Sequence, residues 1–250
     1  MGSKYLTDLA QVLRNAGLRV TEYSGWQTRA RGSGGYESGR PTHVMCHHTA
    51  SPAAADGSGD ANYIATGDSD APLSNLYLDR TGLVWVIAAG ATNTNGSGKD
   101  TWGGGVPENS MNSYAIGIEA GNNGVGEPWP TVQQDAYVKM VKALCNHYNI
   151  SNNNVRAHFE WAPDRKIDPA GQSRYATGSS KWNMNQFRTD CRNSSTPPPK
   201  PKPEPEEEDV VWRVGKRENG AFFLGDGDKA YWVADGGDIG FDEAACRMAP

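Results

Sequence analysis

The sequence predicts an α/β protein with a mixed central β-sheet flanked by helices, followed by a small β-rich C-terminal module. Three observations support this prediction: short apolar runs that end in turn residues, longer segments with apolar residues at helical spacing, and a stretch rich in proline and charge near the C-terminus. Helices and strands are interspersed, which favours a layered sheet covered by helices. At 250 residues the chain can form one domain with a sizeable core and a smaller appendage.

The first half of the chain supplies a helix and three strands. Residues 5–17 carry apolar side chains at helical spacing, with Gly17 as the stop. Residues 42–50 predict a buried strand that runs into polar residues. Residues 73–88 predict two strands joined by a tight turn near Gly82.

The second half of the main domain alternates strand and helix again. Residues 113–121 predict a short apolar strand that ends at an acid, Glu119. Thr131 is placed to cap the next helix, and residues 181–192 predict the last one. The apolar face of the middle helix is predicted to comprise Ala136, Met140, Ala143, Leu144 and Tyr148.

Residues 193–209 predict a linker, because proline alternates with charge there and favours an extended, semi-rigid chain. The linker separates a main domain, residues 1–192, from a C-terminal module, residues 210–250. Alternating apolar residues around Gly220 and Gly227 predict a small β-meander in this module. A module of this size buries little core. Behind a linker it would serve to target the protein to a polymer, although its aromatic residues could equally form its own core.

Composition excludes several classes of protein. A net charge of −5 gives no basic footprint for nucleic acid. No apolar stretch approaches the roughly 18 residues of a membrane span, so we expect no membrane insertion. The N-terminus lacks the apolar core of a secretory signal, so we expect synthesis in a cytoplasm. The four cysteines lack CxxC spacing and are interpreted as ordinary small apolar residues.

The histidines differ in their sequence context. His43 and His147 are expected to be structural or surface residues. His47 and His48 end an apolar strand, from which a side chain can point into a cleft. Successive strand residues face opposite ways, so one of the pair can reach the cleft while the other packs beneath it. The strand pattern does not choose between them.

The segment "RAHFEWAPDRKIDPAG", residues 156–171, concentrates polar chemistry in a turn-prone stretch. It contains His158, Lys166 and Asp168. Two histidines and an aspartate form a suitable set for zinc, with three protein ligands and a fourth position for water. The alternative is a charged surface loop, because ligands so far apart in sequence are a weak signal by themselves.

Three motifs carry a resemblance to a known family. The stretches "VMCHHTAS", "SYAIGIEAGN" and "RAHFEWAPDRKIDPAG" resemble, in the family's order, those of type 2 N-acetylmuramoyl-L-alanine amidases, the zinc amidases related to peptidoglycan recognition proteins. The N-terminal stretch "DLAQVLRNAGLRVTEYSGWQTRARG" further resembles endolysins of phages that infect actinobacteria. The resemblance covers roughly residues 5–192 and implies that residues 1–192 form a zinc amidase domain with the family's fold.

The resemblance also implies roles for individual residues. It makes His47, His158 and Asp168 the ligands of Zn²⁺ and leaves His48 to pack or to supply a supporting hydrogen bond. Glu119 would take a proton from the attacking water and pass it to the leaving nitrogen. Lys166 would stabilise the negative charge that grows on the carbonyl oxygen.

The implied function is that of a phage endolysin. The enzyme would cut bacterial peptidoglycan between N-acetylmuramic acid and L-alanine and so lyse the host. It would act on the cell wall after a holin-type partner has permeabilised the membrane. Trp102, Asn122 and Trp129, in glycine- and asparagine-rich loops, are candidate substrate contacts, with anchoring of the loops as the alternative.

Two other functions stay open, and two features depart from the family pattern. A peptidoglycan-binding protein without catalysis is disfavoured because the ligand set, Glu119 and Lys166 are all present. A metal-free structural protein of a phage particle would bind no zinc. Many relatives carry a tyrosine where this chain has Ser74, and a histidine common in the family is missing from the loop "ATNTNGSG".

Overall fold

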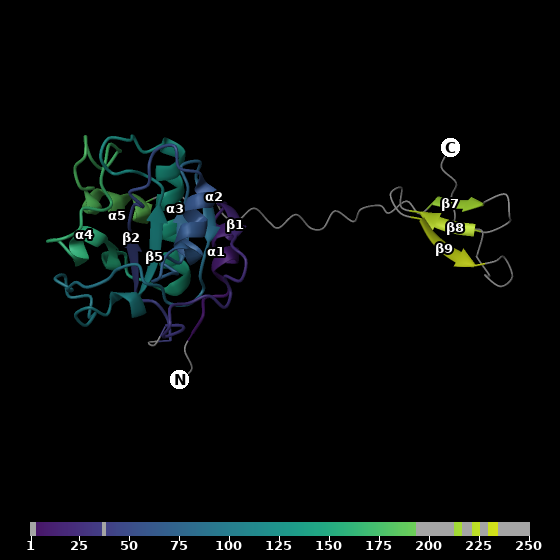
Figure 1. The fold of residues 1–250 in the computed structure, drawn as a ribbon, viewed down its shortest axis with the longest axis horizontal. Coiled ribbons are helices and arrows are strands. Elements are labelled where there is room, and N and C mark those ends of the chain that lie inside the picture. The colour runs from purple at the N-terminus through teal and green to yellow at the C-terminus, as the bar shows by residue number, and fades with distance from the viewer. Residues whose placement is uncertain (1–3, 37–38, 194–212, 217–221, 226–229, 235–250) are drawn as a thin grey trace. The chain divides into compact units, whose positions relative to one another are not determined.

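A computed structural model describes residues 4–36, 39–193, 213–216, 222–225 and 230–234 (Figure 1). The chain divides into two compact units, Met1–Lys200 and Pro201–Pro250, which are described separately. The first unit contains the main sheet and the candidate site. In the described part of the chain, no helix combines the length and the apolar character needed to cross a membrane.

A six-stranded mixed sheet forms the centre of the first unit, in the order β1-β4-β3-β5-β2-β6. The strands β3 and β4 form an antiparallel hairpin, and every other neighbouring pair is parallel. This arrangement confirms the predicted mixed sheet. The strands are β1 (Arg19–Glu22), β2 (His43–Cys46), β3 (Leu76–Leu78), β4 (Leu83–Val86), β5 (Ala115–Ala120) and β6 (Val155–Ala157).

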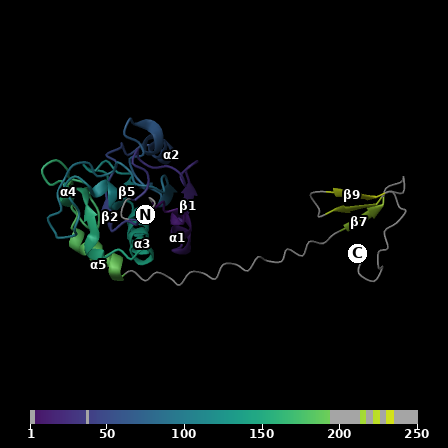
Figure 2. The same ribbon diagram turned by 90° about the horizontal axis from the view of Figure 1, so that it is seen from below.

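Helices cover both faces of this sheet (Figure 2). One face carries α1 (Leu9–Asn15), α3 (Thr131–Tyr148) and α5 (Met184–Asn193), and the other carries α2 (Gly57–Asn62), which runs into the π-helical turn η1 (Tyr63–Gly67). The apolar residues of β2, β3 and β5 alternate between the faces, so one face carries one buried cluster and the other carries two. The remaining short helices are η2 (Met111–Ser113), η3 (Asn152–Asn154) and α4 (His158–Trp161).

The expected helices and strands of the first unit are present, with one correction at α3. Its N-cap is Pro130, and Thr131 is the first helical residue, so Thr131 does not cap the helix. Proline suits this position because it cannot donate the backbone hydrogen bond that a helix start leaves unused. On the predicted apolar face, Ala143 is only partly buried, whereas Ala136, Met140, Leu144 and Tyr148 are buried.

The turn between β3 and β4 lies where the sequence predicts it. Gly82 has a φ of +76°, a conformation that a side chain would strain. The carboxylate of Asp79 accepts hydrogen bonds from the backbone N–H groups of Thr81 and Leu83 and closes the turn. The hairpin register then places Leu76 opposite Val86.

Asn75 ties the sheet to the loop that follows β4. Its side chain is fully buried, and its Nδ2 donates to the carbonyl oxygens of Ala88 and Gly90 at 3.0 and 2.7 Å. Its Oδ1 accepts from the backbone N–H of Gly117 at 3.0 Å and from the hydroxyl of Thr92 at 3.2 Å. One amide thus satisfies polar groups from β5 and from the loop at once.

The substitution Asn75→Ala is expected to destabilise the first unit by about 3 kcal/mol or more, because it leaves several buried polar groups without partners. Urea unfolding followed by near-UV circular dichroism measures the change. Asn153→Ala, at an exposed position, is the control and should shift stability by less than about 0.5 kcal/mol. Equal unfolding midpoints for the two variants would contradict the role given to Asn75.

Three of the cysteines lie in the described residues. Cys46, Cys145 and Cys191 are free and buried, which confirms their interpretation as small apolar residues. Burial raises the pKa of each thiol, so each thiol stays protonated at neutral pH. Cys246 lies outside the described residues.

The second unit contains a three-stranded antiparallel sheet in the order β7-β8-β9. Its strands are β7 (Arg213–Lys216), β8 (Phe222–Gly225) and β9 (Ala230–Ala234). The order agrees with the predicted meander. The expected turn residues Gly220 and Gly227 lie outside the described residues, as does most of the predicted linker.

Candidate functional site

The site forms where three parallel strands end. Because β5, β2 and β6 run parallel, their carboxyl ends meet at one edge of the sheet. His47 directly follows β2, His158 directly follows β6, and Glu119 is the second-last residue of β5. Extending the strand register by one residue places these three side chains in one row on the same face.

His47, His158 and Asp168 come together in the structure. The Nδ1 atoms of the two histidines are 2.9 Å apart, and the Oδ2 atom of Asp168 lies 2.9 Å from one and 3.0 Å from the other. His47 is fully buried, and the other two side chains are nearly so. Among the described residues this is the one group of three that could hold a metal ion.

The outer nitrogens of the two rings show where their protons lie. His158 Nε2 is 2.8 Å from the backbone carbonyl oxygen of Asn95, and His47 Nε2 is 3.2 Å from the side-chain Oδ1 of the same residue. A carbonyl oxygen only accepts, so in the neutral rings Nε2 carries the hydrogen and Nδ1 keeps its lone pair. Two imidazole lone pairs and a carboxylate oxygen therefore face one point.

This donor set fits Zn²⁺. Two imidazole nitrogens and one carboxylate oxygen are ligands that zinc prefers, and three protein ligands are typical of catalytic zinc sites. Their separations of 2.9 to 3.0 Å are close to the roughly 3.3 Å between ligands of a tetrahedral zinc. Without a cation, two lone pairs and a negative charge in contact would repel one another, so only a proton or a metal ion accounts for their convergence.

The pKa values reflect that requirement. Burial disfavours the charged form of His47, but the hydrogen bond with Asp168 and the charges of Glu119 and Asp168 outweigh it and raise its pKa. Burial and the charge of His47 lower the pKa of His158 to about 4. Burial opposes ionisation of Asp168, but its hydrogen bonds with both histidines hold its pKa far below the usual range. The contacts with Asp168 and Glu119 thus favour an added proton on His47 over one on His158.

Glu119 lies beside the cluster without a bonding partner. Its Oε2 atom is enclosed and makes no hydrogen bond within the described residues. Burial raises the pKa of Glu119 to about 7, while the charges of His47 and Lys166 oppose that rise. A carboxyl group with a pKa near neutrality and no partner can both take and give a proton.

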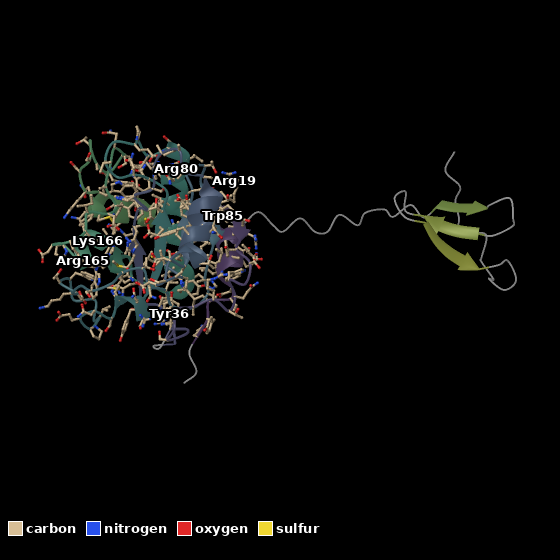
Figure 3. All side chains as sticks on the ribbon, in the orientation of Figure 1. Arg19, Tyr36, Arg80, Trp85, Arg165 and Lys166 are labelled. Atoms are coloured by element: carbon tan, nitrogen blue, oxygen red, sulfur yellow. The ribbon has the colours of Figure 1, made fainter. Side chains whose placement is uncertain are left out.

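Lys166 lies on the segment between α4 and Asp168. Its backbone N–H donates to the carbonyl oxygen of Ala162 at 3.0 Å, which continues the turn of α4. The side chain is partly exposed, and its charge lowers the pKa of both Glu119 and His158. Figure 3 shows Lys166 and Arg165 on the α4 side of the first unit, away from Arg19 and Trp85.

His48 takes the supporting role that the resemblance implies. Its Nδ1 accepts a hydrogen bond from the backbone N–H of Ala170 at 3.1 Å. The carbonyl oxygen of Ala170 accepts another from the indole Nε1 of Trp129 at 2.9 Å. Both polar groups of Ala170 are therefore held two residues after Asp168, which fixes the loop that carries this carboxylate.

Two of the three candidate substrate contacts are buried in this structure. Trp129 is 4% exposed and packs edge-on against Trp182, with 4.6 Å between ring centroids. Asn122 is fully buried, and its Oδ1 accepts from the backbone N–H of Gly124. Neither side chain offers a surface to a substrate in this structure, and their contacts favour the alternative, anchoring of the loops.

The third candidate contact, Trp102, is partly exposed but lies toward the other end of β2. Its ring packs 6.0 Å from that of His43, and the guanidinium of Arg156 lies 4.6 Å from its centroid. His43 precedes His47 by four residues, which is about 13 Å along a strand. The structure therefore does not bring Trp102 to the cluster.

Ser74 occupies the position at which many relatives carry a tyrosine. Ser74 is fully buried, and its hydroxyl donates to the carbonyl oxygen of Leu76. A tyrosine that sequence reasoning did not single out, Tyr77, is paired with Glu119 between β3 and β5. Its hydroxyl donates to the carboxylate of Asp60 at 2.8 Å.

The comparisons with known proteins identify the family. Residues 37–171, more than half of the chain, match the model of the N-acetylmuramoyl-L-alanine amidase family. This match defines the chain as a type 2 amidase. It belongs to the N-acetylmuramoyl-L-alanine amidase family. No curated protein matches the chain.

Solved structures of amidases and endolysins are similar to this chain at low identity. A selenomethionine derivative of AmpD is 19% identical, with a TM-score of 0.49, 69% of this chain covered and 93% of that one. The endolysin LysCS of Clostridium intestinale is 15% identical, with a TM-score of 0.46 and coverage of 70% and 95%. A mutant endolysin from Bacillus subtilis is 19% identical, with a TM-score of 0.47 and coverage of 70% and 99%. The family assignment rests on the sequence match alone.

Proposed function

We propose that this chain is a zinc-dependent endolysin that hydrolyses the amide bond between the lactyl group of N-acetylmuramic acid and L-alanine. The observation that carries the proposal is the convergence of His47 Nδ1, His158 Nδ1 and Asp168 Oδ2 beside an unpartnered Glu119. The three converging side chains would hold the ion. Zinc, when bound, supplies a Lewis acid that polarises a carbonyl and acidifies water.

Glu119 and Lys166 divide the proton transfer and the charge stabilisation. Glu119, with its pKa raised to about 7 by burial, accepts a proton from the water that attacks the carbonyl carbon. It then gives that proton to the amide nitrogen. The carbon–nitrogen bond breaks, and the stem peptide leaves with a free amine on its L-alanine. The ammonium of Lys166 stabilises the negative charge on the former carbonyl oxygen during these steps.

The test measures metal and product together. Purified protein is analysed for zinc, and digested cell walls are assayed for new alanine amino termini and for new reducing sugars. We expect about one zinc per chain, alanine termini without reducing sugars, and loss of activity on chelation that zinc restores. Wall binding with zinc but no product would favour the non-catalytic binding protein, and a protein that neither retains zinc nor cuts the wall would favour the structural one.

Replacing Lys166 with methionine is expected to lower kcat by about 100- to 1,000-fold, the usual loss of one well-placed oxyanion donor. Zinc content should not change, because Lys166 is not one of the converging ligands. The matched control is Lys99→Met, which removes an exposed lysine. A variant with normal kcat but poor zinc retention would give Lys166 a different role.

The phage setting is part of the same proposal. The C-terminal unit would hold the enzyme on the wall, and a holin-type partner would open the membrane between the cytoplasm and the peptidoglycan. We expect that cells producing the chain alone stay intact and that they lyse when a pore-forming agent is added. Lysis without any such agent would contradict the need for a partner.

A further inference from the structure

One residue contacts the outer nitrogen of both histidines of the cluster. Asn95 places its Oδ1 atom 3.2 Å from His47 Nε2 and its backbone carbonyl oxygen 2.8 Å from His158 Nε2. We propose that Asn95 is the positioning residue of the metal centre, which fixes the tautomer and the ring orientation of both imidazoles. This inference rests on the proposed function in that it concerns the same zinc site.

The chemical reason is the single lone pair of a neutral imidazole. If the proton moved to Nδ1, an N–H group would face Asp168 and the lone pair would face Asn95, and a cation could not bind between the rings. Two oxygen atoms opposite the Nε2 positions stabilise the tautomer that binds the metal. A hydrogen bond donated from Nε2 also makes the ligating nitrogen more basic.

Asn95 is itself held in place by its neighbours. It is 1% exposed, and its backbone N–H donates to the side-chain oxygen of Asn112 at 2.8 Å. Its carbonyl oxygen also accepts from Arg165 Nη2 at 2.8 Å, so the loop is joined to the segment just before Lys166. These contacts fix the backbone of Asn95, so its carbonyl oxygen can orient the ring of His158 and its buried side chain starts from a fixed point opposite His47.

The close approach of this loop to the sheet explains a glycine in β5. A Cβ atom at Gly117 would lie 2.3 Å from the hydroxyl oxygen of Thr94, so any side chain there would push the loop away. Thr94 shares a hydrogen bond with Thr92, whose hydroxyl in turn donates to Asn75. The sheet, Asn75 and the two threonines thus set the position of Asn95 relative to the histidines.

Mutation of Asn95 affects its contact with His47 but not its contact with His158. This difference distinguishes a positioning role from a general effect on stability. A side-chain substitution removes the oxygen that faces His47 but leaves the backbone oxygen that faces His158. Asn95→Leu keeps similar bulk without an acceptor, whereas Asn95→Asp presents an oxygen in either orientation of the group. Asn93→Leu is the matched control. Asn93 lies two residues before Asn95 in the same loop, but its side-chain amide donates to the carbonyl oxygen of Asp70.

The experiment measures zinc affinity by competition with a chromophoric chelator and imidazole tautomers by nitrogen-15 NMR, using the full chain. We expect Asn95→Leu to bind zinc about 10- to 100-fold more weakly than the native chain, with Asn95→Asp and Asn93→Leu close to native. The spectra of zinc-loaded native protein should show both rings protonated at Nε2. In metal-free Asn95→Leu, the His47 signals should change while those of His158 stay.

Several outcomes would overturn the inference without touching the proposed function. One is a native zinc complex in which either ring is protonated at Nδ1, which needs no variant and so holds even if Asn95→Leu fails to fold. Another is a zinc affinity of Asn95→Leu equal to that of the native chain, and a third is equal weakening in Asn95→Asp. If instead the native chain binds no zinc at all, the proposed function itself fails.

Discussion

Replacing Asp168 with alanine is expected to abolish both zinc retention and wall hydrolysis, with activity reduced by far more than 100-fold. Loss of a group that only supports a ligand costs 10- to 100-fold, so loss of a ligand should cost more. The variant would keep two neutral nitrogens but no negative charge to offset that of the ion. Zinc analysis after dialysis and the release of alanine amino termini measure the two losses.

Asp164→Ala supplies the matched control for this prediction. Asp164 is an exposed carboxylate on the same segment, four residues before Asp168. Its loss changes the net charge of the loop equally but removes no converging oxygen, so zinc content and rate should stay near native values. If both variants retained one zinc per chain, the cluster would not be the metal site.

The fold was predictable where the pattern of apolar residues was strong. The strand of residues 43–46 contains an unbroken apolar run, the helix of residues 131–148 repeats its apolar residues at helical spacing, and both elements are present. The strand Arg19–Glu22 was missed because it lies at the edge of the sheet and is largely exposed, so it has no apolar alternation. The helix Gly57–Asn62 was missed because its sequence, GSGDAN, has low helical propensity.

The site was only partly predictable, for a physical reason. The strand pattern left His47 and His48 equivalent, and the structure separates them: His47 joins the cluster, and His48 turns toward Ala170. Their separation follows from the alternation of side chains along a strand, but the side that faces the site depends on tertiary packing. The family resemblance implied that His158 and Asp168 meet His47. The spacing of these residues along the sequence did not.

The sequence gives no sign that Asn95, in the loop after β4, contacts the two histidines. Asn95 lies in a stretch whose only noted feature was a missing histidine, yet the structure places it against both imidazoles. An asparagine in a polar loop looks the same whether it faces solvent or a metal ligand. The sequence could not show that Trp129 is buried, because a tryptophan in a glycine-rich loop can face a cleft or anchor that loop from within.

Replacing Glu119 with glutamine is the second substitution from which we expect a very large effect. The amide keeps the size and the burial of the side chain but cannot accept a proton from water, and general acid–base catalysis of this kind is worth about 100- to 10,000-fold. We expect kcat to fall within that range while zinc content stays native. A variant that loses zinc would place Glu119 among the ligands instead.

The pH dependence of kcat in the native chain and in Glu119→Gln tests the role of Glu119 independently of how far kcat falls. Burial raises the pKa of Glu119 to about 7, and a bound cation would lower it, so the native rate should rise with pH around a midpoint at or below 7. The glutamine variant should lose this acidic limb, measured as kcat over a range of pH in which zinc content is checked at each point.

The same pKa predicts a gain in stability when Glu119 is replaced. The folded protein holds the Glu119 proton more tightly than the unfolded chain does. The contribution of this group to the free energy of unfolding is therefore complete below pH about 4.5 and is lost as pH rises through about 7. In the metal-free state, Glu119→Gln should therefore be more resistant to urea than the native chain at pH 8 but not at pH 4.5.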